Sequence, residues 1–174
     1  MVRSIYAYDA SGRGHTTSLG EDIRMFGARD FEHLRVALES PADRLVIGSV
    51  VRGAVTIKPN IPVALRINDQ GGRLAGIVGA SILPEYFFDF YESLELEHDG
   101  AVILMLSDGT VLARYPVLAK PLDDVSHSVA FMNQVSGKPT GTLKIVTPFD
   151  QRERILSFRS VPNYDMIIMA STRT

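Results

Sequence analysis

The sequence predicts an α+β protein made of two successive modules, each an antiparallel sheet of about five strands with flanking helices. Short runs rich in β-branched residues, such as 45–51 and 61–67, are typical of strands. Turns that contain Asp and Gly join pairs of these runs into hairpins. The plan of hairpin, helical middle and closing strands occurs twice, and the last strand reads IVGAS at 77–81 and IIMAS at 167–171. We therefore interpret the chain as an internal duplication.

The first module opens with a predicted hairpin over residues 5–18. Its turn uses Asp9 to bond its own backbone and Gly12 to accept a positive φ. The second arm is polar and is expected at a sheet edge. Residues 19–29 predict a loop with a short helix, and 30–39 predict a helix whose first residue, an aspartate, caps it.

The middle of the chain predicts three strands and a helix. Residues 45–51 form the first strand, and 61–67 and 74–82 form a hairpin around the turn at 69–72. A helix over 84–94 follows, opened by a proline whose missing N–H would be unpaired in the first turn anyway.

The second module repeats this order. Its hairpin uses the turn at 107–110, its short helix covers 125–135, and three strands close the chain: 141–149, 154–161 and 165–171. We therefore place the first module at 1–83, a connecting helix and linker at 84–98, and the second module at 99–174.

Composition narrows the class of function. The chain has 174 residues, of which 45% are hydrophobic and 22% are charged, as expected for a folded protein. The net charge is −2 and no stretch concentrates Lys and Arg, so no nucleic-acid partner is expected. The longest apolar runs, 75–83 and 101–106, fall short of the ~20 residues needed to span a bilayer. Because the chain begins in a strand-like segment, we expect it to be part of a longer protein.

No catalytic or metal-binding constellation is found in the sequence. The chain has no cysteine, and its four histidines stand at none of the spacings that metal sites favour, so no metal and no cofactor are expected. The carboxylates of Asp9, Asp69, Asp108 and Asp150 lie at predicted turns, where bonding to the local backbone explains them.

Two basic residues are candidates for a binding site. His33 shares the predicted helix with Asp30 and Arg35, so acid, imidazole and guanidinium can meet at one cavity mouth; a solvated helix face is the open alternative. Arg52 follows an apolar strand and could direct an anion-binding guanidinium into the concave face of the sheet. A surface loop position is the alternative for Arg52.

Several segments taken in order resemble a known family. They are 30–48, 61–67, 76–81, 84–87 and 108–116. Their order and spacing are similar to those of the extracytoplasmic sensor domains of bacterial signalling proteins, the double Cache family, also described as tandem PAS-like or PDC domains. The resemblance covers nearly the whole chain.

The resemblance implies a periplasmic part of an inner-membrane protein. It implies a membrane-distal PAS-like module that binds a small molecule, a membrane-proximal module, and a cytoplasmic output such as a histidine kinase or diguanylate cyclase. The family's long N-terminal helix is absent from this chain, and membrane contact would occur only through segments outside it. A homodimer of the full-length protein is an open expectation, because the family often builds it on that helix.

Some of the residues that bind ligands in this family also occur in this sequence. Family members commonly read Asp-Arg-Glu-His-Phe-Arg-Val-His in this helix. The matching residues here are Asp30, Glu32, His33, Arg35 and Val36, whereas Phe31, Leu34 and Ala37 differ. Amino-acid-binding relatives carry an acidic residue near the place of Ser81, and a serine cannot supply that charge. We therefore expect a small carboxylate, rather than an α-amino acid, held by Arg52 or Arg35 with His33 and Ser81.

The leading hypothesis is a non-catalytic sensor module that passes ligand binding to a cytoplasmic kinase or cyclase. The alternative is a stand-alone PAS-like adaptor that binds a protein partner without a small ligand. An enzyme would need a nucleophile and a base that the sequence does not offer.

Overall fold

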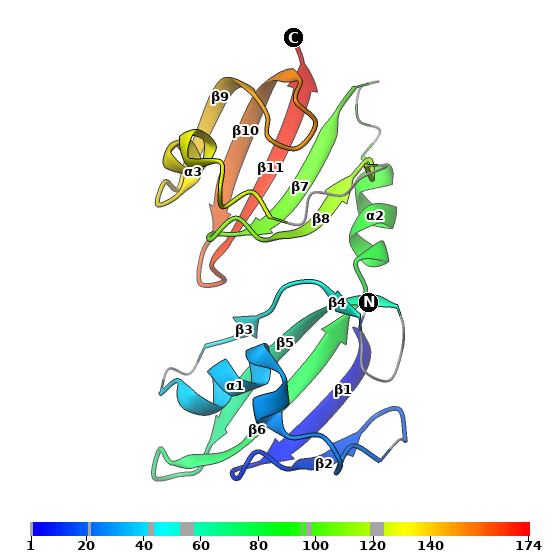
Figure 1. Ribbon diagram of the computed structural model, residues 1–174, viewed down its shortest axis with the longest axis vertical. Coiled ribbons are helices and arrows are strands. Elements are labelled where there is room, and N and C mark those ends of the chain that lie inside the picture. The colour runs from blue at the N-terminus through cyan, green and yellow to red at the C-terminus, as the bar shows by residue number, and fades with distance from the viewer. Residues whose placement is uncertain are drawn as a thin grey trace. The chain divides into compact units, whose positions relative to one another are not determined.

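The computed structural model describes residues 2–20, 22–41, 44–52, 58–94, 96, 99–118 and 124–174. It divides into two compact units, Met1–Leu83 (unit 1) and Pro84–Thr174 (unit 2). Each unit contains one antiparallel sheet with a helix against it (Figure 1). The predicted α+β class with two tandem modules is therefore confirmed.

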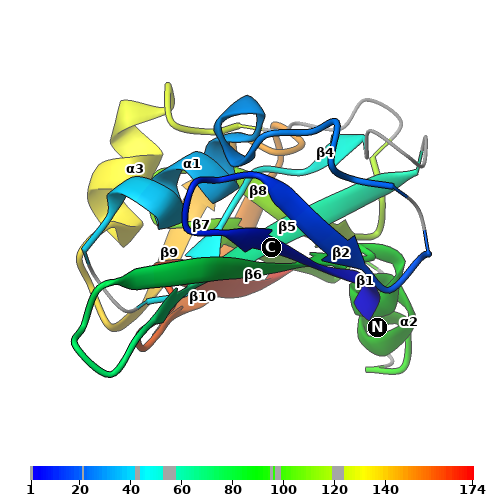
Figure 2. The ribbon, with the colours of Figure 1, turned by 90° about the horizontal axis from the view of Figure 1, so that it is seen from below.

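Unit 1 is built on a sheet with the strand order β2-β1-β6-β5-β3, in which β4 also pairs with β5. The strands are β1 (Val2–Asp9), β2 (Gly14–Thr17), β3 (Val46–Ile47), β4 (Val51–Arg52), β5 (Pro59–Asn68) and β6 (Leu74–Ile82). A 3-10 turn, η1 (Ala28–Asp30), leads into helix α1 (Glu32–Glu39). Figure 2 shows α1 lying over one face of this sheet.

Both predicted turns of unit 1 are confirmed. Asp9 Oδ1 accepts hydrogen bonds from the backbone N–H groups of Ser11, at 2.8 Å, and Arg13, at 3.1 Å. Gly12 has a φ of 85°, which a residue with a side chain rarely adopts. In the β5–β6 turn, Asp69 Oδ1 likewise accepts hydrogen bonds from the backbone N–H groups of Gly71, at 2.8 Å, and Arg73, at 2.9 Å. The polar strand β2 lies at a sheet edge, as predicted.

The predicted strand at 45–51 is wrong in detail. It is divided into β3 and β4, so the described part of unit 1 has six strands rather than five. Between the two short strands the Gly48 N–H still donates to the Pro62 carbonyl of β5 at 2.8 Å, and Gly48 and Ser49 line a pocket. A glycine weakens a strand interior, which is consistent with an interruption at this point.

Asp30 does not cap α1, contrary to the sequence prediction. The helix begins at Glu32, and its N-cap residue, Phe31, makes no side-chain capping bond. The Asp30 carboxylate instead accepts a hydrogen bond from the Gly27 N–H at 2.8 Å, which closes the preceding 3-10 turn. The carboxylate is therefore engaged one turn earlier than its spacing suggested.

The core of unit 1 lies between α1 and the sheet. Its buried members come from β1, the 23–28 segment, α1, β5 and β6. They are Tyr8, Ile23, Ala28, Leu34, Ala37, Leu38, Ala64 and Ile77. Because side chains alternate along each strand, Tyr8 brings Ser4 and Tyr6 onto the same face of β1.

Unit 2 has the sheet order β8-β7-β11-β10-β9. Its elements are α2 (Glu85–Glu92), β7 (Ala101–Leu106), β8 (Val111–Tyr115), α3 (Val129–Val135), β9 (Thr140–Val146), β10 (Glu153–Val161) and β11 (Met166–Arg173). Helix α3 contributes Phe131 to the core, where its ring packs edge to face against that of Phe149, with the ring centroids 5.5 Å apart. Both α3 and β9 are shorter than predicted, and 147–152 form a turn.

The predicted connecting segment at 84–98 begins with α2, which clusters with unit 2. Glu95, Glu97 and His98 of that segment lie outside the described residues, as do residues 119–123. None of the helices formed by the described residues is long and apolar enough to cross a bilayer.

Candidate ligand-binding site

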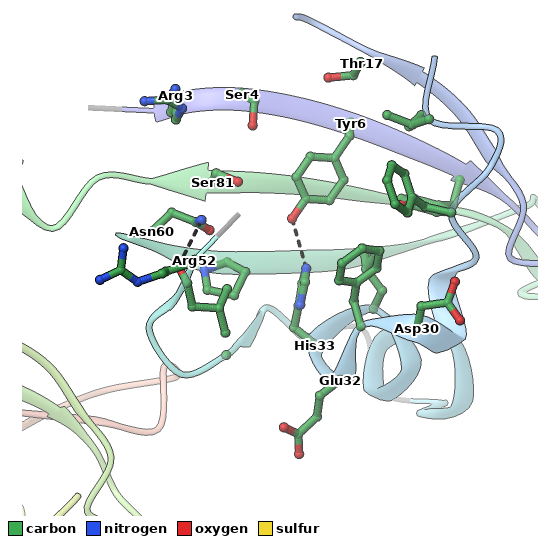
Figure 3. A pocket seen from close by; sticks show the side chains of 18 of the residues that line it. Arg3, Ser4, Tyr6, Thr17, Asp30, Glu32, His33, Arg52, Asn60 and Ser81 are labelled. Carbon is green, nitrogen blue, oxygen red and sulfur yellow. Dashed lines mark hydrogen bonds between the residues drawn. The ribbon is translucent and has the colours of Figure 1, made fainter. Parts of the chain in front are cut away.

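A pocket of about 390 Å³ lies in unit 1, between α1 and the face of the sheet that α1 covers (Figure 3). Strands β1, β5 and β6 supply its floor. The first turn of α1 and the segment from Gly48 to Arg52 supply its opposite wall. Polar and apolar groups line different parts of this space.

Tyr6 and His33 meet at the middle of the pocket. The Tyr6 hydroxyl lies 2.9 Å from His33 Nε2, and it can also donate to the Ala80 carbonyl oxygen at 3.4 Å. Burial lowers the pKa of His33 to about 4. Burial likewise raises the pKa of Tyr6 to about 12. Both groups are therefore uncharged at neutral pH, and their contact is a hydrogen bond between neutral partners.

Two glycines make room for this pair. A Cβ at Gly79 would lie 2.2 Å from Cε2 of Tyr6, so the Tyr6 ring can cross β6 only where no side chain projects. A Cβ at Gly48 would lie 3.2 Å from the Cβ of His33 and 3.0 Å from Cγ of Pro62. The two glycines thus allow Tyr6 and His33 to approach each other.

Polar side chains gather on one side of the Tyr6–His33 pair. They are Arg3, Ser4, Arg52, Asn60 and Ser81 (Figure 3). The amide of Asn60 donates to the Val51 carbonyl at 3.2 Å and so ties β5 to β4 beside Arg52. The Nε of Arg3 is buried and has no hydrogen-bond partner among the described residues. A buried guanidinium N–H without an acceptor favours an anion at this end.

The other part of the pocket is mainly apolar and aromatic. Tyr8, Ile23, Phe26, Phe31 and Leu34 line it. The rings of Phe26 and Phe31 pack edge to face, with centroids 6.0 Å apart. Asp30 lies on this side of the Tyr6–His33 pair in Figure 3, and Glu32 points away from it. The pocket therefore has a cationic polar end and an apolar end.

Comparison with known proteins identifies the family of this chain. The family model described as dCache_1-like, a histidine kinase sensor domain, matches residues 84–171, which is half of the chain. The chain belongs to this sensor-domain family. A search of curated protein sequences finds no match.

Solved structures of other proteins share this fold over nearly the whole of this chain. The extracellular domain of rpHK1S-Z16, a protein assigned as a histidine kinase, has a TM-score of 0.84 at 23% identity, covering 99% of this chain and 71% of its own. The ligand-binding domain of the Pseudomonas fluorescens chemoreceptor CtaA, in complex with L-serine, has a TM-score of 0.67 at 18% identity, covering 99% and 73%.

A third neighbour is much longer than this chain. The extracellular ligand-binding receptor from Desulfohalobium retbaense has a TM-score of 0.68 at 16% identity. The match covers 98% of this chain but only 30% of that receptor. At these identities the likeness establishes the fold.

The dCache pocket brings together four of the five residues singled out from the sequence. Asp30, His33, Arg52 and Ser81 all line it. Arg35 does not line it, because its guanidinium pairs with Glu39 one turn along α1, at 3.3 Å, with 45% of each side chain exposed. The spacing of Asp30, His33 and Arg35 along the helix therefore does not translate into one shared site.

Sequence reasoning missed the contribution of β1. Arg3, Ser4 and Tyr6 line the pocket, yet the first strand was interpreted only as one arm of a hairpin. The alternation of Ser4, Tyr6 and Tyr8 was the available signal, since it predicts three inward polar or aromatic groups. Arg3 joins them because the β1–β6 register shifts between Val2 and Ser4, and such an irregularity is not visible in a sequence.

Proposed function

We propose that this chain is the extracytoplasmic sensing domain of a transmembrane receptor and that the pocket of unit 1 binds a small carboxylate. The observation that carries the proposal is the buried Nε of Arg3, which has no acceptor among the described residues and lines the same pocket as Arg52. Two guanidinium groups at one end of a pocket suit a carboxylate, which they can bind through several charge-assisted hydrogen bonds.

The remaining lining supports a carboxylate with an apolar tail. Ser4, Asn60 and Ser81 offer further hydrogen bonds at the cationic end, while Phe26 and Phe31 lie at the apolar end. Each buried methylene of a tail is worth about 0.8 kcal/mol, or about a fourfold gain in affinity.

An α-amino acid fits this lining less well. Its ammonium group would lie next to its carboxylate, and the acidic side chains of the described lining are Asp30 and Glu32. Asp30 lies on the far side of the Tyr6–His33 pair and bonds Gly27, and Glu32 points away. Beside Ser81 there is thus no described carboxylate to neutralise an ammonium group. We therefore infer a ligand class that differs from the L-serine in the CtaA complex.

In this proposal unit 1 is the membrane-distal module, residues 84–98 at the start of unit 2 are the connection, and the rest of unit 2 is the membrane-proximal module. The domain itself binds and does not catalyse. Ligand binding would shift the population of two conformations, and segments beyond this chain would pass that shift to a cytoplasmic kinase or cyclase. The location would be periplasmic, in an inner-membrane protein that forms a homodimer.

Thermal unfolding of the purified chain tests the proposal. A series of straight-chain monocarboxylates of increasing length is compared with the matching amides and with α-amino acids. A ligand at about 100 times its dissociation constant should stabilise the protein by about 2.7 kcal/mol. We expect stabilisation by carboxylates, none by amides, and an affinity that rises with chain length.

Variants locate the site. Arg3→Ala and Arg52→Ala should each abolish the stabilisation, whereas Arg35→Ala, which removes a guanidinium outside the pocket, should retain it. A response that survives both pocket variants would place the ligand elsewhere. If no compound of the series stabilises the chain, the adaptor function without a small ligand becomes the better interpretation.

A further inference from the structure

A buried cluster of ionic side chains lies at one end of the core face of unit 2. Arg114 on β8 and Arg154 on β10 both bond Oδ2 of Asp150, which precedes β10. The distances are 3.2 Å from Nη2 of Arg114, 2.7 Å from Nη2 of Arg154 and 3.0 Å from Nε of Arg154. The exposed fractions of the three side chains are 10%, 5% and 10% for Arg114, Arg154 and Asp150. A carboxylate is therefore bound between two guanidinium groups out of solvent.

The cluster occupies the place that the pocket occupies in unit 1. The two sheets have the same strand order, so β6 corresponds to β11 and β5 to β10. Ser81 of β6 pairs with Pro62 of β5, and Ser171 of β11 pairs with Leu156 of β10. These serines end the repeated segments IVGAS and IIMAS. Ser81 lines the pocket of unit 1, and Ser171 is buried in unit 2.

The register also aligns the two arginines with pocket residues. Asn60 stands two residues before Pro62, and Arg154 stands two residues before Leu156, so they are equivalent positions on the same face. Asn60 lines the pocket. Arg154 thus places a guanidinium in unit 2 at the position that corresponds to a pocket-lining residue of unit 1.

The edge strands align in the same way. Thr17 of β2 pairs with Tyr6 of β1, and Arg114 of β8 pairs with Ile103 of β7. Tyr6 in turn pairs with Gly79, two residues before Ser81, and Ile103 pairs with Met169, two residues before Ser171. Thr17 lines the pocket, so Arg114 is also at an equivalent pocket-lining position.

We propose that unit 2 contains a carboxylate-binding site that is occupied by the protein's own Asp150, and that this site takes a free small carboxylate when Asp150 is removed. The segment before β5 contributes Arg52 to the pocket of unit 1. The segment before β10 contributes instead the carboxylate that fills the corresponding place. Unit 2 is then closed to outside ligands, and only unit 1 can receive one.

The charge balance of the cluster supports an anion-binding site. Two buried cations face one buried carboxylate, and the Nε of Arg114 and the Oγ of Ser171 are buried without a hydrogen-bond partner among the described residues. The carboxylate of Asp99 pairs with Arg152 and Arg173, at 3.6 and 3.5 Å. Removal of Asp150 would therefore leave two buried guanidinium groups with unmet demand for an anion.

Asp150→Gly tests the inference, because the deleted group has the size and charge of acetate. Thermal unfolding of the full chain is compared in sodium acetate and in sodium chloride at equal ionic strength. We expect the variant to melt below wild type in chloride and to gain Tm with acetate concentration, by more than wild type does. The wild-type response to acetate reports on unit 1, so the difference between the two proteins reports on unit 2 alone.

Two further variants control for the site. Asp150→Asn keeps the space filled and should show no extra response to acetate. Arg154→Leu added to Asp150→Gly should abolish the response. Refolding yields of Asp150→Gly and Asp150→Ser in the two salts provide a second measurement should either variant be unstable. Equal Tm values, or equal yields where no melting transition exists, would overturn the inference.

Discussion

Replacement of His33 should remove a pH-dependent part of the stability of unit 1. His33 is buried at the start of α1, and its burial lowers its pKa to about 4 from an ordinary 6.5. In the unfolded chain the imidazole takes up a proton near pH 6.5. Between these two values the unfolded state therefore binds more protons than the folded state does.

The sign and size of the effect follow from that difference. The stability is fully present above pH 6.5 and is lost as the pH falls towards 4, below which both states are protonated. Each unit of pKa difference is worth about 1.36 kcal/mol, so the loss across this range is about 3 kcal/mol. That is a large part of the total stability of a domain of this size.

Urea unfolding at a series of pH values from 7 to about 4 measures the loss. His33→Gln keeps a side chain that can reach Tyr6 but does not titrate, so the variant should lack this pH dependence. Carboxylates that titrate in the same range are common to both proteins and cancel in the difference. His15→Gln is the matched control, since His15 is exposed on β2.

The expected result is a stability advantage of wild type over His33→Gln that falls by about 3 kcal/mol between pH 7 and pH 4. A constant difference over the whole range would refute the reasoning. It would show that His33 takes up its proton equally well in the folded and unfolded states.

Three further predictions follow from the packing. Gly79→Ala should destabilise unit 1 by about 1–3 kcal/mol in urea unfolding, because the new methyl group displaces the Tyr6 ring; unchanged stability would contradict the close approach. Phe131→Ala should cost about 3–5 kcal/mol, since it empties the core position against Phe149, and a cost below 1 kcal/mol would show that the core refills. Arg35→Ala should change stability by less than about 0.5 kcal/mol in the same assay, because it removes an exposed pair, and a larger loss would mean a buried role.

Local chemistry made several parts of the fold predictable. The turns at Asp9 and Asp69 depend on a carboxylate that bonds the next few backbone N–H groups and on a glycine with positive φ. All these groups lie within four residues, so no distant contact is needed. The predicted strand at 45–51 is interrupted after Ile47, where Gly48 lies against Pro62 and His33; these close neighbours are distant in sequence and are not visible in the local pattern.

The site was predictable only where a residue's position followed from its own element. His33 was singled out by its place near the start of a predicted helix and Ser81 by the family resemblance, and both line the pocket. Arg3 was missed, because it enters the pocket through a register shift between β1 and β6. Asp150 was interpreted as a turn residue. Arg154 lies only four residues along the chain, but nothing local to Asp150 indicates that Arg114 also reaches its carboxylate.

The sequence by itself determined the number of modules, their α+β class and their hairpin turns, since alternation and turn chemistry act between neighbouring residues. The tertiary structure decided which charges meet. Arg3 and Arg52 reach one pocket from separate strands, while Arg114 and Arg154 enclose Asp150 in the other unit. Such meetings depend on strand register, which only the packed sheet fixes.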